Sequence, residues 1–315
     1  MPDSKSLTSA GNPFLFVVGC PRSGTTLLQR MLDNHPQLAV ANDTHFITRA
    51  AKKVLRKDPQ PLMTPELLDA VISYRRFYRM RLDESEVRKA AENCPTYAEF
   101  VSRLYTLRGQ RKQKLLSGEK TPDYCRQIPV LHKLFPDARF VHIIRDGRNT
   151  ALSTLNWASA SKGPGKWSLW NEDPVGTCAL WWRWQAGTGQ RDGDLLEGGF
   201  YLKVKYEELV AHPENELQAI ALFLGIPNSD SMANYHAGKT KHAPGLSAKS
   251  AWLPPVKNLR DWRNNMSAED IGVFEGIAGE LLRKNGYPCL DKPPSDAVTS
   301  RVRRCLAWWE SDGKG

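Results

Sequence analysis

Residues 14–28 read FLFVVGCPRSGTTLL, an apolar run followed by a glycine-bounded loop and then a stretch suited to a helix. Gly19 and Gly24 allow the backbone to curl so that successive N–H groups face one point. The dipole of the following helix adds positive potential there. The stretch therefore predicts a buried strand, a phosphate-binding loop and a helix, with an anion bound at the turn.

The loop has the glycine spacing of the nucleotide-binding motif in which a Lys precedes a Ser or Thr. Thr25 stands where that motif places its Lys, and the cation of this loop, Arg22, lies inside the turn instead. A γ-phosphoryl group is normally held by that Lys and by Mg²⁺ on the Ser or Thr. A P-loop small-molecule kinase is therefore the weaker interpretation, although it stays open at this point.

A second basic turn follows a second apolar run. Residues 138–144 read ARFVHII and lead into Arg145 and, eight residues later, Ser153. Upstream lies the segment Lys120-Thr121-Pro122. Ligands of open parallel sheets bind beyond the carboxyl ends of the strands, so we expect Arg22 and Arg145 to face one crevice. Two anionic groups on one ligand fit that arrangement.

These segments resemble the PAPS-dependent sulfotransferase superfamily, whose donor is 3′-phosphoadenosine 5′-phosphosulfate (PAPS) and whose product is PAP. Residues 21–27 resemble its 5′-phosphosulfate loop, and residues 145–153 resemble its 3′-phosphate site. The resemblance covers about residues 14–290 and implies an α/β fold, a P-loop NTPase-like parallel sheet flanked by helices. The donor-binding residues that it implies in these two segments are Arg22, Ser23, Gly24, Thr25, Thr26, Leu27, Arg145 and Ser153.

Arg22, in place of the Lys of cytosolic small-molecule enzymes, resembles the tyrosylprotein sulfotransferase branch and many bacterial sulfotransferases. The same branch implies that Lys120 contacts the donor and that Tyr206, in a Tyr-Glu-x-Leu segment, lies near the 3′-phosphate. Residues 257–263 resemble the family's basic segment before its final helix, which implies a 3′-phosphate contact from Lys257 or Arg260.

Asp43 stands where the branch has its general base, a Glu, and it is one methylene shorter. His45 is the substitute candidate for the base. The other interpretation of residues 42–44 is a helix cap, because Asn, Asp and Thr are all good capping residues. In the catalytic interpretation the acceptor's proton goes to Asp43, while Arg22 and Lys120 stabilise negative charge on the leaving oxygen in an in-line displacement.

No metal is expected, because the sulfuryl group carries less charge than a γ-phosphoryl group and protein cations can balance it. The sequence also lacks a recognisable cluster of metal ligands. Besides the kinase, a nucleotide-binding module without turnover remains an alternative. The acceptor itself, a small molecule, a glycan or a peptide, is not specified by these motifs.

The expected organisation is a flexible leader (1–13), a single domain (14–290) and a C-terminal tail (291–315). Alternating strand and helix patterns support a parallel sheet, interrupted after its second strand by a helical insertion at 44–110. Capping residues suggest helix starts at Thr44, Thr64, Asp83 and Thr96. We expect the insertion to lie on the acceptor side, because variable segments over a fixed site are where such folds change substrate.

Five tryptophans gather within residues 167–184, and two more lie at 308 and 309 in the tail. The first group predicts either a packed helix of the core or a stacking wall for the adenine or the acceptor. The tail predicts either a helix docked on the domain or a contact with acidic membrane lipid. Residues 236–255 are rich in Gly, Ser, Lys and Pro and predict a long loop that closes over the donor.

The 315 residues carry 44 Lys and Arg against 34 Asp and Glu, a net charge of +10, and a hydrophobic content of 41% that is ordinary for a globular protein. The charge is spread along the chain, so nucleic-acid binding is not expected. The six cysteines contain no C-x-x-C pair. With no apparent signal peptide or membrane span, the expectation is a cytoplasmic enzyme, with a homodimer as an open alternative.

Overall fold

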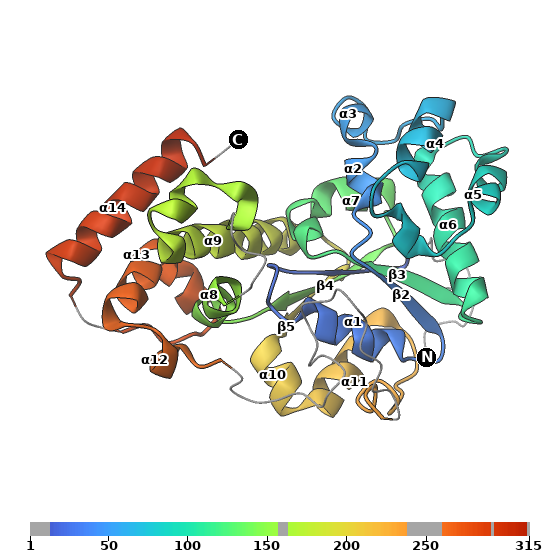
Figure 1. The fold of residues 1–315 in the computed structure, drawn as a ribbon. Coiled ribbons are helices and arrows are strands. Elements are labelled where there is room, and N and C mark those ends of the chain that lie inside the picture. Colours follow the sequence, from blue (N-terminus) through green and yellow to red (C-terminus); the bar gives the residue numbers. More distant parts are fainter. Residues whose placement is uncertain (1–12, 157–162, 238–259, 291–292, 314–315) are drawn as a thin grey trace.

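The computed structural model describes residues 13–156, 163–237, 260–290 and 293–313 of the chain. Its centre is a five-stranded sheet with strand order β2-β3-β1-β4-β5, in which every neighbouring pair is parallel (Figure 1). The strands are β1 (Leu15–Val18), β2 (Leu38–Asn42), β3 (Leu116–Lys120), β4 (Arg139–Ile144) and β5 (Tyr201–Lys205). The predicted fold class is therefore confirmed.

The strand register brings the carboxyl ends of the central strands together. Val17 of β1 pairs with Lys120 of β3 on one side and with Val141 of β4 on the other. On β2, Asn42 also pairs with Lys120. Segments that follow these four strands consequently start at one edge of the sheet, which is where parallel sheets bind ligands.

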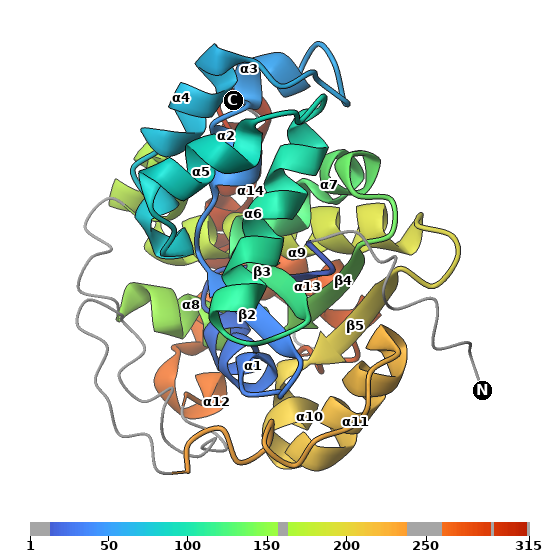
Figure 2. The same cartoon turned by 90° about the vertical axis from the view of Figure 1, so that its right-hand side faces the viewer.

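Each face of the sheet is covered by its own set of helices, as alternation along a strand requires. Leu15 and Val17 pack into one hydrophobic cluster, which includes α1, α10 and α11, whereas Phe16 and Val18 pack into another with α6 and α7. Figure 2 shows the first set below the sheet and the second above it. These helices are α1 (Thr25–Asp33), α6 (Tyr97–Arg111), α7 (Ile128–Leu134), α10 (Tyr206–Ala211) and α11 (Pro213–Leu224).

Between β2 and β3 the chain forms helices α2 (Phe46–Arg49), α3 (Lys52–Leu55), α4 (Pro65–Ile72), η1 (Phe77–Met80), α5 (Glu84–Ala91) and α6. Three of the predicted helix starts are confirmed. Thr64 and Thr96 accept hydrogen bonds from Leu67 N–H and Glu99 N–H, and Glu86 accepts one from Asp83 N–H in a capping box.

The predicted helix start at Thr44 is wrong. Helix α2 begins at Phe46, and its N-cap is His45, in a left-handed conformation with φ of 59° and without a side-chain capping bond. The carboxylate of Asp43 pairs with cations rather than with the amides of α2. Its capping interpretation is consequently excluded, which leaves the side chain available for chemistry.

A long helix carries most of the tryptophan group. Helix α9 (Pro174–Asp194) holds Trp182 in the core, where its Nε1 donates to Arg145 O at 3.1 Å. Trp167, Trp181 and Trp184 contact one another, and Trp167 and Trp184 also contact Trp309 of helix α14 (Asp296–Ser311). The first group thus belongs to a packed helix of the core and the tail docks on the domain, which is one of the two alternatives predicted for each segment.

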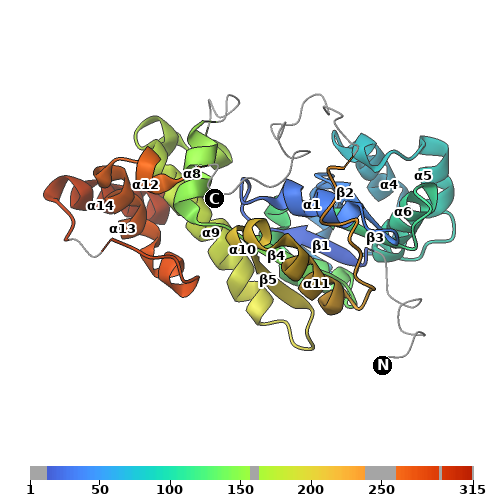
Figure 3. The same ribbon diagram turned by 90° about the horizontal axis from the view of Figure 1, so that it is seen from below.

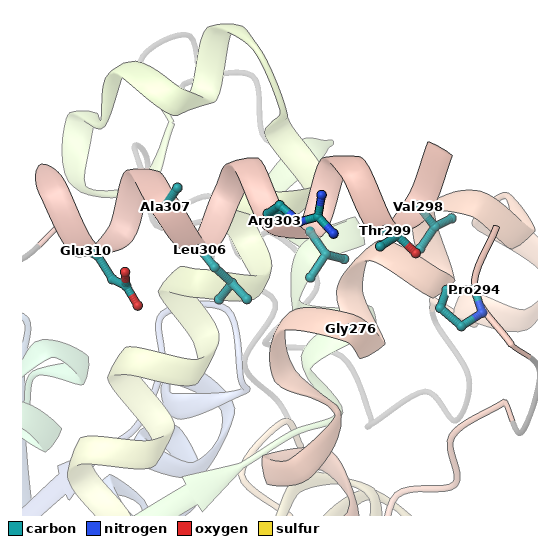
Figure 4. A pocket seen from close by; sticks show the side chains of 9 residues that line it. Gly276, Pro294, Val298, Thr299, Arg303, Leu306, Ala307 and Glu310 are labelled. Carbon is teal, nitrogen blue, oxygen red and sulfur yellow. The ribbon is translucent and has the colours of Figure 1, made fainter. Parts of the chain in front are cut away.

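The C-terminal helices lie at one end of the molecule and the insertion at the other, with the sheet between them (Figure 3). Helix α13 (Ala268–Lys284) packs on α9 and α14. A surface pocket of about 460 Å³ opens beside α14, and Figure 4 shows its apolar lining with Arg303 and Glu310. In the described ranges no helix is long and apolar enough to cross a membrane.

The remaining elements are the 3₁₀ helices η2 (Pro122–Arg126), η3 (Pro164–Lys166) and η4 (Ser168–Asn171) and the helices α8 (Gly147–Leu155) and α12 (Trp262–Asn265). Helices α8 and η2 start at the same sheet edge as the loop after β1, because they follow β4 and β3. This edge is where the predicted site residues gather.

Candidate active site

The loop between β1 and α1 forms as predicted, with two glycines at positions that no larger residue fits. A Cβ on Gly19 would lie 2.5 Å from Ile143 O, and one on Gly24 would lie 2.3 Å from the ring of Tyr206. Gly24 also has a φ of +94°, and Arg22 inside the turn has a φ of 78°. Glycine adopts a positive φ without strain, whereas Arg22 is strained there, and such strain recurs at functional loops.

Arg22, Arg145 and Ser153 come together at this loop. Arg22 Nε donates to Ser153 Oγ at 3.1 Å, and Arg145 Nη1 donates to Arg22 O at 3.4 Å. Burial, and then the nearby cations Arg260 and Arg145, lower the pKa of Arg22. Three arginines from distant segments thus face one region, and an anion placed there would remove their mutual repulsion.

Tyr206 completes this basic region from the other side. The guanidinium carbon of Arg145 lies 4.3 Å from the centre of the Tyr206 ring, which also packs against the glycine loop. The ring fixes Arg145 by a cation–π contact. The structure therefore unites the two motifs and Tyr206, as predicted, while Lys257 lies outside the described residues.

The other loop residues have different surroundings. Ser23 and Thr25 are buried, and Leu27 lies in the cluster under the sheet, so only the backbone of Leu27 can serve the loop. Thr26 Oγ1 accepts a hydrogen bond from Lys120 Nζ at 3.4 Å. That bond places Lys120 directly beside the start of α1.

Lys120 and Asp43 form an ion pair at the sheet edge. Lys120 is 1% exposed, and its Nζ lies 3.0 Å from Asp43 Oδ1. Arg79 of η1 approaches the other carboxylate oxygen at 3.7 Å. Burial alone would raise the pKa of Asp43, but the pairing with Lys120, followed by His45 and Arg79, leaves that pKa below its usual value.

His45 lies two residues on and faces a different carboxylate. Its Nδ1 is 3.9 Å from Asp123 Oδ2. Burial, and then the positive charge of Arg76, lower the pKa of His45 to about 4, although Asp123 and Asp43 oppose the shift. The imidazole is consequently neutral near pH 7 and only weakly basic.

Several basic residues close to Asp43, His45 and Asp123 were not predicted from the sequence. Arg79 and Arg76 belong to the insertion, and no local motif connects them with Asp43, which lies more than thirty residues earlier. Arg126 stands out only in the structure, where its guanidinium carbon lies 3.8 Å from the centre of the Trp184 ring. Its position beside the Lys120-Thr121-Pro122 segment could have suggested a site role.

Arg148 lies in the second motif, but its side chain forms buried ion pairs with two carboxylates. It is fully buried, donates to both oxygens of Asp146 at 3.0 and 2.7 Å, and reaches Glu275 at 2.6 Å. These pairs join α8 to α13 beneath the arginine region. Of the two arginines in that turn, Arg145 alone faces the glycine loop through a described contact.

The pocket beside α14 is separate from this site. Its lining comes from residues 276–310, and none of the predicted site residues belongs to it. The paired charges instead lie at the sheet edge, where parallel α/β proteins bind ligands.

Residues 13–230 match the model for a sulfotransferase family. The protein-tyrosine sulfotransferase A of Caenorhabditis elegans is 26% identical over 90% of this chain and 70% of its own length. The protein-tyrosine sulfotransferase 2 of Gallus gallus is 29% identical over 93% of this chain and 76% of its own length.

Solved sulfotransferases share the fold. The sulfotransferase domain from the curacin biosynthetic pathway superposes with a TM-score of 0.52 at 17% identity, covering 93% of this chain and 97% of that domain. A mouse sulfotransferase complexed with PAP gives a TM-score of 0.50 at 16% identity, with 96% and 94% coverage. The kinase and the binding-only alternatives are thereby set aside, because the chain belongs to the sulfotransferase family and is an enzyme of sulfuryl transfer.

Proposed function

We propose that this enzyme transfers a sulfuryl group from PAPS to the phenolic oxygen of a tyrosine in a peptide, with Asp43 as the proton acceptor. The observation that carries the proposal is the arrangement at the sheet edge. Three arginines converge on the glycine loop, and a Lys120–Asp43 ion pair with an N···O distance of 3.0 Å lies next to it. One end of this arrangement suits two anionic groups, and the other suits an acid–base step.

The donor's two anionic groups would divide between two sets of residues. The loop amides, Arg22 and Thr26 would hold the 5′-phosphosulfate, since they surround the N-terminus of α1. Arg145, Ser153 and Arg260 would hold the 3′-phosphate, with Tyr206 behind them. Lys257 stays a prediction for the same group.

The reaction forms one S–O bond and breaks another. The acceptor oxygen attacks sulfur in line while its proton passes to Asp43, and the electron pair of the breaking S–O bond moves to the bridging oxygen of PAP. Lys120 and Arg22 would stabilise the charge that develops there, a preorganised electrostatic contribution. Since Lys120 pairs with Asp43 in the structure, its attraction to the donor would weaken that pair and raise the pKa of Asp43 toward a useful base.

His45 is retained as the weaker candidate for the base. Its ring is neutral near pH 7 and could accept a proton, but the carboxylate that it contacts is Asp123, at 3.9 Å. Asp43 instead contacts the lysine that the donor requires.

The charges around the carboxylate favour an acidic acceptor. Arg79 contacts Asp43, and Arg76 and Arg49 lie close enough to His45 to lower its pKa. Arg126 lies on the same side, next to Asp123. Acidic residues flanking a tyrosine would complement these cations, and the relatives' names include the words protein-tyrosine. A glycan or small-molecule acceptor is the competing outcome.

Transfer of label from [³⁵S]PAPS to a synthetic peptide tests this function. The peptide carries one tyrosine between Asp and Glu residues, and its matched controls replace either the tyrosine by Phe or the acids by Asn and Gln. We expect label on the tyrosine peptide in EDTA, less label on the neutral peptide and none on the Phe peptide. Labelling of phenols or glycans without labelling of the peptide would contradict the proposed acceptor.

Two further predictions concern the state of the enzyme. The EDTA in that assay tests metal independence, because chelation would abolish transfer by an enzyme that requires a divalent metal. A homodimer remains a prediction that sedimentation velocity can check at micromolar concentration. The cytoplasmic location expected from the sequence stays a prediction as well.

A further inference from the structure

A fully buried carboxylate lies directly behind the proposed base. Glu119 precedes Lys120 in β3, so the two side chains point to opposite faces of the sheet. Glu119 is 0% exposed and accepts hydrogen bonds from three donors: the backbone N–H of Thr44 at 3.0 Å, the Tyr105 hydroxyl at 2.7 Å and the Thr121 hydroxyl at 2.5 Å. Both of its oxygens are therefore engaged.

The position of this carboxylate is costly for a protein core. Burial raises the pKa of Glu119, and its three donors counter that shift only in part. An apolar side chain at the same site would avoid the desolvation of a charged group. At this site Glu119 accepts a hydrogen bond from the turn that follows β2.

That turn is strained on both sides of Thr44. Asp43 and His45 have φ values of 56° and 59°, in the left-handed region that is unfavourable for residues with a Cβ. Two hydrogen bonds fix the turn: Asp43 N–H donates to Lys120 O at 2.6 Å, and Thr44 N–H donates to Glu119 Oε1. Both anchors lie on adjacent residues of β3.

We propose that Glu119 is a positioning residue for Asp43. Held by Tyr105 and Thr121, it fixes Thr44 N–H and so maintains the turn that presents the Asp43 carboxylate to Lys120. Tyr105 belongs to α6, so the same contact links the helical insertion to the proton acceptor. The inference rests on the proposed role of Asp43 in proton transfer.

Amide hydrogen exchange tests the positioning without any acceptor. Tyr105→Phe removes one donor to Glu119, and Tyr97→Phe is the matched control. Tyr97 is also a fully buried tyrosine of α6, and its hydroxyl donates to Ile47 O at 2.8 Å. We expect the Thr44 amide to exchange about tenfold faster in Tyr105→Phe than in Tyr97→Phe, in the presence of PAP. Equal exchange at Thr44 in the two variants would overturn the proposal.

A double-mutant cycle tests the consequence for catalysis, with transfer to the acidic tyrosine peptide as the readout. We expect Tyr105→Phe to lower kcat about tenfold, with the dissociation constant of PAP unchanged and with little effect from Tyr97→Phe. In the Asp43→Asn background, Tyr105→Phe should lower kcat no further, because the group that it positions is already absent. An equal fall in both backgrounds would show a merely structural role and overturn the proposal.

The outcomes separate this inference from the proposed function. If the peptide is not labelled, the acceptor assignment fails while the exchange experiment still decides the positioning. If Asp43→Asn retains full kcat, the base assignment fails and the catalytic part of this inference is overturned with it. Glu119→Gln provides a second variant. It replaces one carboxylate oxygen, an acceptor, by an amide NH₂ group, a donor, and should reproduce the faster exchange at Thr44.

Discussion

The carboxylate of Asp43 is held between Lys120 and Arg79, at 3.0 and 3.7 Å. We predict that Asp43→Asn lowers kcat by about 10²–10⁴, the usual range for a lost general base, with PAP affinity changed less than about twofold. Steady-state transfer assays and calorimetry measure the two effects. Asp33→Asn is the control, because it breaks a similar pair, with Lys112 at 2.8 Å, away from the site. A comparable fall in kcat for both variants would contradict the assignment.

Gly24 is the loop position where an added carbon has the clearest steric effect. A Cβ there would lie 2.3 Å from the Tyr206 ring, whereas at Gly225, with a φ of +69°, nothing lies within 4 Å. Alanine at either position would carry the backbone strain of a positive φ, which costs about 1–2 kcal/mol. We therefore predict that Gly24→Ala abolishes PAP binding by calorimetry and that Gly225→Ala costs stability alone. Equal PAP affinity of the two variants would exclude a tight fit at the loop.

His45 makes stability depend on pH. Its folded pKa is about 4 against an ordinary value of 6.5, so between these values the unfolded chain binds a proton that the folded one does not. Stability is therefore full above pH 6.5 and falls as the pH drops toward 4, by up to about 3 kcal/mol for this group. Urea titrations at pH 7 and 5 should show the fall, and His45→Asn should reduce it. Buried His142, with a pKa of about 3, supplies a remaining dependence of the same sign.

Among the helices, α14 is held on the domain by ion pairs as well as by tryptophan contacts. Arg301 donates to both oxygens of Asp173 at 2.9 and 3.0 Å and contacts Glu269 and Asp270, while Arg304 stays 3.8 Å from Asp173. Asp173 is 1% exposed and caps α9 through Gly176 N–H.

We predict that Arg301→Ala lowers the free energy of unfolding by about 2–4 kcal/mol, because it leaves a buried carboxylate without its main partner. Arg304→Ala should cost less than about 1 kcal/mol. Urea unfolding measures both variants. Equal costs would mean that α14 is held by its apolar contacts alone.

Three helix starts in the insertion could be predicted from the local sequence. Thr64, Asp83 and Thr96 cap helices where expected, because these choices depend on neighbours a few residues away. Thr44 has equally good capping chemistry, yet Glu119, 75 residues later, takes its N–H. Tertiary contacts of this kind leave no local pattern.

In the whole molecule, the parallel sheet follows from the alternating pattern of strands and helices, and the two motifs could be placed at one edge because parallel strands end together. Arg22, Arg145, Ser153 and Tyr206 were therefore predictable as a group. Arg79 and Arg126 were not, because their approach to the site depends on how the insertion and α9 fold over the sheet. Residues proposed to face the acceptor therefore depend on tertiary packing that leaves no local motif.

Every role proposed for these residues requires that the arginine-lined edge binds the donor nucleotide. Calorimetric titration of PAP into the metal-free enzyme and into Arg145→Ala measures it most directly, with ATP as competitor and Arg139→Ala, whose arginine lies at the opposite end of β4, as the control variant. We predict micromolar binding of PAP to the enzyme and to Arg139→Ala, loss of binding in Arg145→Ala, and weak competition by ATP. Absence of PAP binding, or ATP binding that requires metal, would contradict it.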